Sequence, residues 1–522
     1  MKCCVLTRLT LRLLLCLIGI PSVAQDAPPA TTTNPIPQSD VIPTVAGEPP
    51  PYRSISHHQL SVGDLEISYE AIAGETYLRD SAGNAIGSIF SFTYLRNDVA
   101  NRDRPVLFIF NGGPGSASLW LHLGALGPKK VELDEEVNPS NIPPFVLSDN
   151  ENSPLDIADL VFIDPIGTGF SRPLNGTDPK IFWGVDEDAD AIAQFIELWL
   201  TEYGRWNSPK FVLGESYGST RAAVLSRFLM GGPFPPGILR GISLNGIVMV
   251  GTQLENPASS KTPEQVLQQN ALRIPGIAVT SAYHKLVPVR GNIEDHFRQA
   301  LEFSKTRYLS ALQQLAQEKL SDEEKTGILE EIKKLTGLSA AQIGEDLVIN
   351  EKEYAKIALQ KQGLEIGIYD SRYTLPLANS GQNPVADDPA MTRYGPGFVA
   401  AFHELLRSHL NVKLNRAYRS VSWKDLLPHW NWDRGFTPIP IQNSAQELAW
   451  SMRRNPNLRV MVASGYFDLA TTPAAAFDQI ESGGVPAERV TFKEYPSGHM
   501  VYLGGTEQAF AEDLRQFLQA GR

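Results

Sequence analysis

A serine lies between two glycines in the segment Gly214-Glu-Ser-Tyr-Gly218, the spacing of a sharp strand-to-helix turn that exposes a nucleophilic hydroxyl. The apolar stretch Lys210–Leu213 before it is typical of a buried strand, and the stretch Ser219–Met230 after it is compatible with a helix. The two glycines let the backbone bend sharply. We therefore expect Ser216 to be a nucleophile; the alternative is an ordinary tight turn.

A nucleophilic serine needs a base and a residue that orients the base. In α/β-hydrolases they follow the serine in the order Asp or Glu, then His. Asp468 follows the apolar stretch Leu458–Gly465, and His499 follows a second candidate strand, Arg489–Tyr495. His499 is also the only one of the nine histidines that is C-terminal to Asp468. We predict a Ser216–His499–Asp468 triad; the alternative for His499 is a surface loop residue.

An oxyanion formed at the serine needs two backbone donors. Tyr217, directly after the serine, supplies the first. The glycine-rich segment Asn111–Ser116 follows the apolar stretch Val106–Phe110 and supplies the second, for which we choose Gly113. This segment lacks the Gly-Lys-Ser/Thr of a phosphate-binding loop, and the alternative is a simple turn.

The elements around these residues alternate between strand and helix. Alternating stretches after Tyr52 predict antiparallel strands, and continuous apolar runs ended by glycine-rich turns predict buried, parallel ones. We expect an α/β fold, the α/β-hydrolase fold, with a mixed, mostly parallel central sheet and an inserted helical cap. The continuous runs are "VLFIF", "LVFID", "KFVL", "LRVMVASG" and "RVTFKEY".

Changes in composition divide the chain. We predict a signal peptide (1–24), a disordered Pro/Thr-rich leader (25–51), a first part of the hydrolase core (52–250), a mainly helical cap (251–432) and a second part of the core (433–522). A second independent domain is the alternative to the cap, but candidate sheet strands resume after it.

The first residues combine three basic side chains and an apolar run with the small-x-small site Ser22-Val-Ala24. All three cysteines fall within this signal, so the mature chain forms no disulfide. This favours export in a bacterium, to the periplasm or the medium. Cys16 as a lipid anchor is the alternative, although the preceding "LLL" lacks small residues.

Removal of residues 1–24 takes three of the 46 basic residues and none of the 58 acidic ones, so the net charge falls from −12 to −15. Without a basic block, nucleic acid is not expected as a partner. No stretch after the signal is long and apolar enough to predict a membrane span.

Histidine spacing predicts no metal site. His57 and His58 point to opposite faces of an extended chain, and His403 and His409 are too far apart for one helical face. The triad chemistry needs no cofactor.

Five blocks in order, "NGGPGSASLW", "IDPIGTGFS", "GESYG", "SGYFD" and "PSGHM", resemble the serine carboxypeptidase family between Val106 and Tyr502. The resemblance implies that Glu215, Asn111 and the amide of Gly112 bind the C-terminal carboxylate of a peptide. It also implies that Met500 lines the pocket of the leaving residue, although core packing is an alternative.

An acidic residue beside the nucleophile then has an explanation. Two carboxyl groups share a short hydrogen bond only when one is protonated, and burial beside a like charge raises the pKa of the glutamate. We expect an acidic optimum. The sequence departs from the family pattern at Ala125, where a second glutamate is usual, and at Ile109, where a tryptophan is usual. Ser116 stands where family members commonly carry a cysteine.

The sequence thus predicts an exported serine carboxypeptidase that forms an acyl-enzyme with peptides. An esterase or acyltransferase with the same triad is the first alternative, since Ala125 weakens the peptide-specific site. A binding protein without catalysis is the second.

Overall fold

The computed structural model describes residues 48–99, 103–232, 237–289, 291–434 and 441–521. The predicted signal peptide and residues 25–47 of the predicted leader lie outside this part. The end of that leader is described, and there Glu48 forms an ion pair with Arg79 at 2.6 Å.

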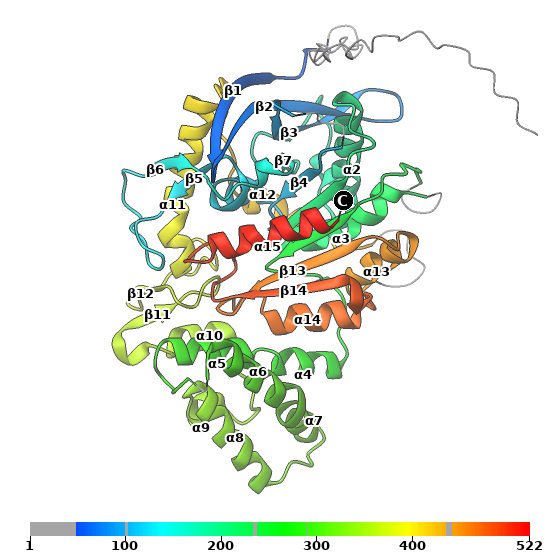
Figure 1. Cartoon of the computed structure of the whole chain (residues 1–522). Coiled ribbons are helices and arrows are strands. Elements are labelled where there is room, and N and C mark those ends of the chain that lie inside the picture. The colour runs from blue at the N-terminus through cyan, green and yellow to red at the C-terminus, as the bar shows by residue number, and fades with distance from the viewer. Residues whose placement is uncertain (1–47, 100–102, 233–236, 290, 435–440, 522) are drawn as a thin grey trace, which may run out of the picture. The chain divides into compact units, whose positions relative to one another are not determined.

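A ten-stranded mixed sheet forms the centre of the described fold (Figure 1). Its order is β1-β2-β3-β7-β4-β9-β10-β13-β14, and β8 pairs with β3. Six strands, β7, β4, β9, β10, β13 and β14 in their order along the sheet, run parallel to one another. Strands β1, β2 and β3 extend the sheet on the β7 side with antiparallel pairing. The strands are β1 (Arg53–Val62), β2 (Leu65–Arg79), β3 (Ala85–Arg96), β4 (Val106–Phe110), β7 (Asp159–Asp164), β8 (Arg172–Pro173), β9 (Lys210–Glu215), β10 (Gly246–Val250), β13 (Arg459–Gly465) and β14 (Val490–Tyr495).

The parallel strands are buried on both faces, which explains their continuous apolar sequences. In β4, Leu107 and Ile109 belong to one hydrophobic cluster, and Phe108 and Phe110 belong to the other. Helices that contribute to these clusters are α2 (Val185–Glu202), α3 (Tyr217–Met230), α13 (Ala445–Arg454) and α14 (Pro473–Ser482) on the Phe108 side, and α1 (Leu119–Leu121), α11 (Pro389–Glu404) and α15 (Glu507–Ala520) on the Leu107 side. The predicted α/β-hydrolase fold is confirmed.

The helical region predicted between 251 and 432 packs in two parts. Its first helices share a hydrophobic cluster of their own. Tyr394, Phe398 and Phe402 of α11 instead belong to the cluster on the Leu107 side of the sheet. The helices of the first part are α4 (Pro263–Ala271), α5 (Ile274–Tyr283), α6 (Ile293–Phe303), α7 (Leu309–Ala316), α8 (Asp322–Thr336), α9 (Ala340–Ile343) and α10 (Glu351–Ile357). The domain boundaries themselves stay predictions.

Two small hairpins and a short helix lie outside the central sheet. The hairpins are β5 (Lys129–Glu132) with β6 (Val146–Asp149) and β11 (Leu364–Ile366) with β12 (Thr374–Pro376), and the short helix is α12 (Trp423–Leu426). Within the described ranges, no helix has the length and apolar character that crossing a membrane requires.

Candidate active site

Ser216 lies at the sharp turn between β9 and α3. Its backbone has φ 59° and ψ −126°, an uncommon conformation for a residue with a side chain. Gly214 permits the turn, because a Cβ there would lie 2.1 Å from the carbonyl oxygen of Gly218. Ser216 donates its amide to the carbonyl of Val250 at 2.8 Å. Its side chain is partly exposed, whereas Glu215 and Tyr217 are buried.

Asp468 and His499, each in a loop after a parallel strand, form a hydrogen-bonded pair. His499 Nδ1 lies 2.8 Å from Asp468 Oδ2. Asp468 also accepts the amides of Ala470 and Thr471 at 2.8 and 2.9 Å and the Thr471 hydroxyl at 2.6 Å. Burial lowers the pKa of His499, but the charge and hydrogen bond of Asp468, together with the charges of Glu215 and Asp388, outweigh it, so the net shift is upward. Asp468 therefore stabilises the positive charge that His499 gains when it accepts a proton as a base.

The end of β10 brings the serine loop and the histidine together. Val250 accepts the Ser216 amide, and a Cβ on the next residue, Gly251, would lie 2.8 Å from two atoms of the His499 ring. Among the described residues, no hydrogen bond joins the Ser216 hydroxyl to His499. In enzymes without substrate such bonds are often long and tighten when substrate binds.

The glycine-rich segment after β4 packs against the start of α3. A Cβ on Gly112 would lie 2.5 Å from both the Glu215 carbonyl oxygen and the Tyr217 nitrogen. Within the described part of the chain, the amides of Gly113 and Tyr217 have no hydrogen-bond acceptor. Two free donors in adjoining segments are what an oxyanion site requires.

Glu215 is buried and held by two neutral donors. Asn111 Nδ2 donates to Oε1 at 2.7 Å, and the Tyr502 hydroxyl donates to Oε2 at 2.5 Å. Burial raises the pKa of Glu215 above its usual value, while the opposing effects of His499 and of both donors reduce the shift. Asn111 is fixed in turn, since its Oδ1 accepts the Leu121 amide at 3.1 Å. The structure therefore brings Asn111, Gly112 and Glu215 together beside Ser216.

Met500 is buried in the main hydrophobic cluster, as are the two positions that depart from the family pattern, Ala125 and Ile109. For Met500 this packing agrees with the core alternative, and its contact with a leaving residue stays a prediction. No carboxyl group is present at position 125 to share a proton with Glu215.

Four aromatic residues around the site, Tyr369, Trp430, Trp432 and Tyr502, were not predicted. The Tyr217 ring lies 5.4 Å from Trp430 and 5.8 Å from Trp432. Tyr369 lies edge-on to His499 at 5.3 Å. Tyr502, which bonds Glu215, lies only three residues after His499, and this position could have indicated that it belongs to the site. The others come from regions without any motif, so only the fold reveals them.

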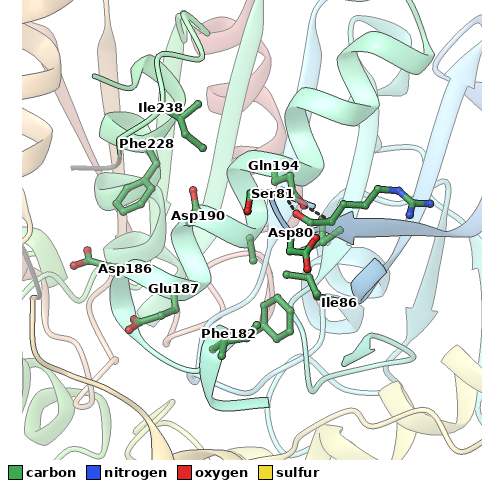
Figure 2. Close-up of a pocket in the computed structure, with 14 residues that line it drawn as sticks. Asp80, Ser81, Ile86, Phe182, Asp186, Glu187, Asp190, Gln194, Phe228 and Ile238 are labelled. Atoms are coloured by element: carbon green, nitrogen blue, oxygen red, sulfur yellow. Dashed lines mark hydrogen bonds between the residues drawn. The ribbon is translucent and has the colours of Figure 1, made fainter. Parts of the chain in front are cut away.

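A pocket of about 630 Å³ lies away from these residues (Figure 2). It is lined by the turn between β2 and β3, including Asp80 and Ser81, and by Asp186, Glu187 and Asp190 of α2. None of the predicted site residues lines it. In the described ranges, no group of three or more His, Cys, Asp or Glu side chains is arranged to hold a metal ion.

The fold and a serine at the strand-to-helix turn, near a His–Asp pair, define an α/β-hydrolase. Residues 77–270 match the serine carboxypeptidase family. The chain is 30% identical over 143 residues to the pheromone-processing carboxypeptidase of Aspergillus niger (27% of this chain, 21% of that protein) and 34% identical over 146 residues to that of Saccharomyces cerevisiae (26% and 18%). The match to the serine carboxypeptidase family lies within residues 77–270.

The matched region spans about a fifth of the length of these two relatives. Among solved structures, the proline iminopeptidase of Mycobacterium smegmatis is similar with a TM-score of 0.37 and 13% identity, over 89% of this chain and 98% of that one.

Proposed function

We propose that this protein is a serine carboxypeptidase that releases C-terminal amino acids from peptides. His499 takes the proton of the Ser216 hydroxyl, whose oxygen attacks the carbonyl carbon of the last peptide bond. The amides of Gly113 and Tyr217 bind the resulting oxyanion. His499 then gives its proton to the departing amine, and water releases the acyl group by the same steps in reverse.

The observation that carries the proposal is the buried carboxyl group of Glu215 beside the nucleophile. Its two hydrogen-bond donors, Asn111 and Tyr502, are neutral, and no cationic side chain is hydrogen-bonded to it among the described residues. A protonated Glu215 donates a hydrogen bond to a substrate carboxylate, whereas an ionised one repels it. A peptide with a free C-terminal carboxylate is therefore the substrate class that this site explains.

The pH optimum follows from two groups whose required states differ. His499 must be neutral to accept a proton, so activity rises with pH through its pKa. Glu215 must be protonated to bind the carboxylate, so activity falls as pH rises through its pKa. The pKa of each group is shifted upward, by Asp468 for His499 and by burial for Glu215. We infer a bell-shaped profile in which His499 sets the rising limb and Glu215 sets the falling limb. The upward shift of His499 moves the rising limb to higher pH, so the proposal of an acidic optimum rests on the need for a protonated Glu215 alone.

An esterase or acyltransferase is the second candidate function. The packed alanine at position 125 supports it, because a single carboxyl at Glu215 holds a substrate carboxylate less firmly than two would. Turnover of esters without release of a free amino acid would favour this candidate.

The test is release of free amino acids from blocked dipeptides between pH 4 and 8. Ser216→Ala should abolish release. The control Ser226→Ala, further along α3 with its hydroxyl bonded to Ala223 and Ser451, should retain it. A wild-type enzyme that reacts with a fluorophosphonate but releases no amino acid would support the second candidate. Failure of both reactions would support a binding protein.

We also propose export, from the signal-like residues 1–24. N-terminal sequencing of protein from the periplasm or medium of a bacterial host should begin at Gln25. A lipid attached at Cys16 would contradict this cleavage and support the anchored form.

A further inference from the structure

The turn between β11 and β12 lies against both loops of the His–Asp pair. The Leu469 amide donates to the Ile368 carbonyl at 2.9 Å, and the Ser371 amide donates to the Phe467 carbonyl at 2.9 Å. These two bonds flank Asp468. We call residues 367–373 the bridging segment.

The same segment holds the histidine directly. The His499 amide donates to the Tyr369 carbonyl at 2.6 Å. The bridging segment thus joins the acid loop and the base loop, which come from different strands, through three backbone hydrogen bonds.

Arg372 reinforces the contact with the histidine loop. Its guanidinium bonds Asp370 through Nη2 at 2.6 Å and through Nε at 2.9 Å. It also donates from Nη1 to the carbonyls of Pro496 at 2.9 Å and Gly504 at 3.2 Å, one on each side of His499. Arg372 and Asp370 are both buried. A planar group with five donors can make all these bonds at once, which a lysine cannot.

The contact leaves little room for adjustment. A Cβ on Gly498 would lie 2.4 Å from Asp370 Cβ, and one on Gly504 would lie 2.4 Å from Arg372 Nη2. The histidine loop therefore needs glycines where the bridging segment touches it.

The bridging segment is itself anchored in the helical region. Asp388, the N-cap of α11, accepts the Ile368 amide at 2.6 Å. The Ser371 hydroxyl lies 2.6 Å from that of Thr280 in α5, and His284 Nε2 donates to the Ser371 carbonyl at 2.7 Å. The segment thus links the helices outside the sheet to the loops at its edge.

We propose that the bridging segment holds Asp468 and His499 in their working geometry, with Arg372 as a positioning residue. The proposal rests on the proposed function, in which His499 is the base. Loops that carry catalytic groups need such support, since a misplacement of about 1 Å costs on the order of a hundredfold in rate.

The first test is the rate of fluorophosphonate labelling of Ser216 across pH 4 to 9, for Arg372→Lys and the matched control Arg489→Lys. Arg489 also donates to three backbone carbonyls, those of Met452, Asn455 and Pro456, but away from the site. We expect Arg372→Lys to lower the maximal rate about tenfold or more, since the base is misplaced. The control should match the wild type.

Arg372→Lys should also change the pH dependence of the labelling rate. The rate rises with pH as His499 loses its proton, and the midpoint of this rise should move to lower pH. Asp468 holds the pKa of His499 up against burial, so a looser pair lowers it. The other ionisable groups that act on His499 are Glu215 and Asp388, and both remain, as does the Tyr369 ring that faces it. A merely destabilised protein would lose rate with an unchanged midpoint, and that result would overturn the proposal.

Amide hydrogen exchange provides a test that needs no activity. Peptides that contain Leu469 and His499 should exchange faster in Arg372→Lys than in Arg489→Lys, since both amides donate to the bridging segment. Equal exchange would overturn the proposal even in an active enzyme. Absence of labelling in the wild type would instead count against the proposed function.

If Arg372→Lys does not fold, Thr280→Val provides a second variant. It removes the partner of the Ser371 hydroxyl and should give the same changes in labelling rate, midpoint and exchange, but smaller ones.

Discussion

At the scale of single residues, the proposed mechanism assigns the falling limb of the pH profile to Glu215. Glu215→Gln removes the titrating group, so peptide hydrolysis should no longer fall at the pH where the wild type declines. The amide keeps the acceptor for Asn111, and the Tyr502 hydroxyl can accept from its nitrogen. The measurement is kcat/KM for a blocked dipeptide from pH 4 to 8. An unchanged falling limb would exclude Glu215 as its source.

Tyr502→Phe tests the same assignment without removing the carboxyl group. The tyrosine hydroxyl donates to Glu215 and lowers its pKa, so its loss should raise that pKa further. The falling limb should therefore move to higher pH. Tyr495→Phe, whose hydroxyl bonds Asp513, is the control and should leave the limb in place. A shift to lower pH in Tyr502→Phe would contradict the argument.

The residues of the site differ in how readily the sequence reveals them. Ser216, Asp468 and His499 are predicted from the sequence because their order in the chain and the glycines around the serine have a chemical reason, and their catalytic role stays a prediction. Tyr369 and Trp430 could not, since an aromatic side chain fits a core as well as a site and neither belongs to a motif. Their contacts depend on how distant segments pack.

At the scale of elements, the loop after β4 and the turn before α3 touch through Gly112. A methyl group at this position would press on two backbone atoms at 2.5 Å, neither of which can turn aside. Gly112→Ala should destabilise the protein by about 1–3 kcal/mol and reduce activity far more, because it separates the two oxyanion donors. Thermal melting and kcat/KM measure the two effects.

Gly327→Ala is the control for this substitution. It lies within α8, and a Cβ there would have no atom within 4 Å. Alanine favours the helix by about 1 kcal/mol over glycine, so stability should be kept or should rise. If Gly112→Ala were as harmless, the two segments would not be in the contact described.

Elements could be predicted where composition and period agree. Strands β4, β7 and β9 have continuous apolar sequences, which are typical of strands that are buried on both faces of a sheet. Helix α3 begins at Tyr217, directly after the serine, although the sequence pattern indicated a later start. Strand β10 was missed. It is as short as β4, but β4 is followed by the glycine-rich segment Asn111–Ser116, whereas no motif follows β10.

At the scale of the whole described fold, the order of the sheet follows from the alternation of strands and helices, but the packing of the helical region does not. Helix α11 and helix α8 are both amphipathic, yet α11 covers the sheet and α8 lies in a separate cluster. An apolar face on a helix predicts that this face will be buried, but it does not predict which element will cover it.

Stability against pH is a property of the whole fold, and two buried groups act on it in opposite directions. Burial lowers the pKa of His122 to about 3. Its ring lies 4.1 Å from Phe162, and the Tyr94 hydroxyl lies 2.7 Å from Nε2. Burial raises the pKa of Asp164 to about 6, although Ser118 and Tyr418 donate to it.

Whether acidification raises or lowers the stability of the fold depends on whether the folded or the unfolded chain binds the proton at higher pH. Between about pH 6.5 and 3 the unfolded chain protonates His122 and the folded chain does not, so stability falls on acidification by up to about 1.4 kcal/mol per pH unit. Between about pH 6 and 4 the folded chain protonates Asp164 first, which adds stability at a similar rate. The two contributions nearly cancel in the acidic range where we propose activity.

Single substitutions should therefore expose each contribution. The free energy of unfolding, measured by urea at pH 4, 5, 6 and 7, should fall more steeply on acidification in Asp164→Asn and less steeply in His122→Phe than in the wild type. Asp322→Asn, at an exposed position in α8, is the control and should parallel the wild type. Since His122→Phe also removes the partner of Tyr94, a uniform loss of about 1 kcal/mol accompanies it, and only the slope decides. Slopes that change in the same direction in both variants would contradict the opposed pKa shifts.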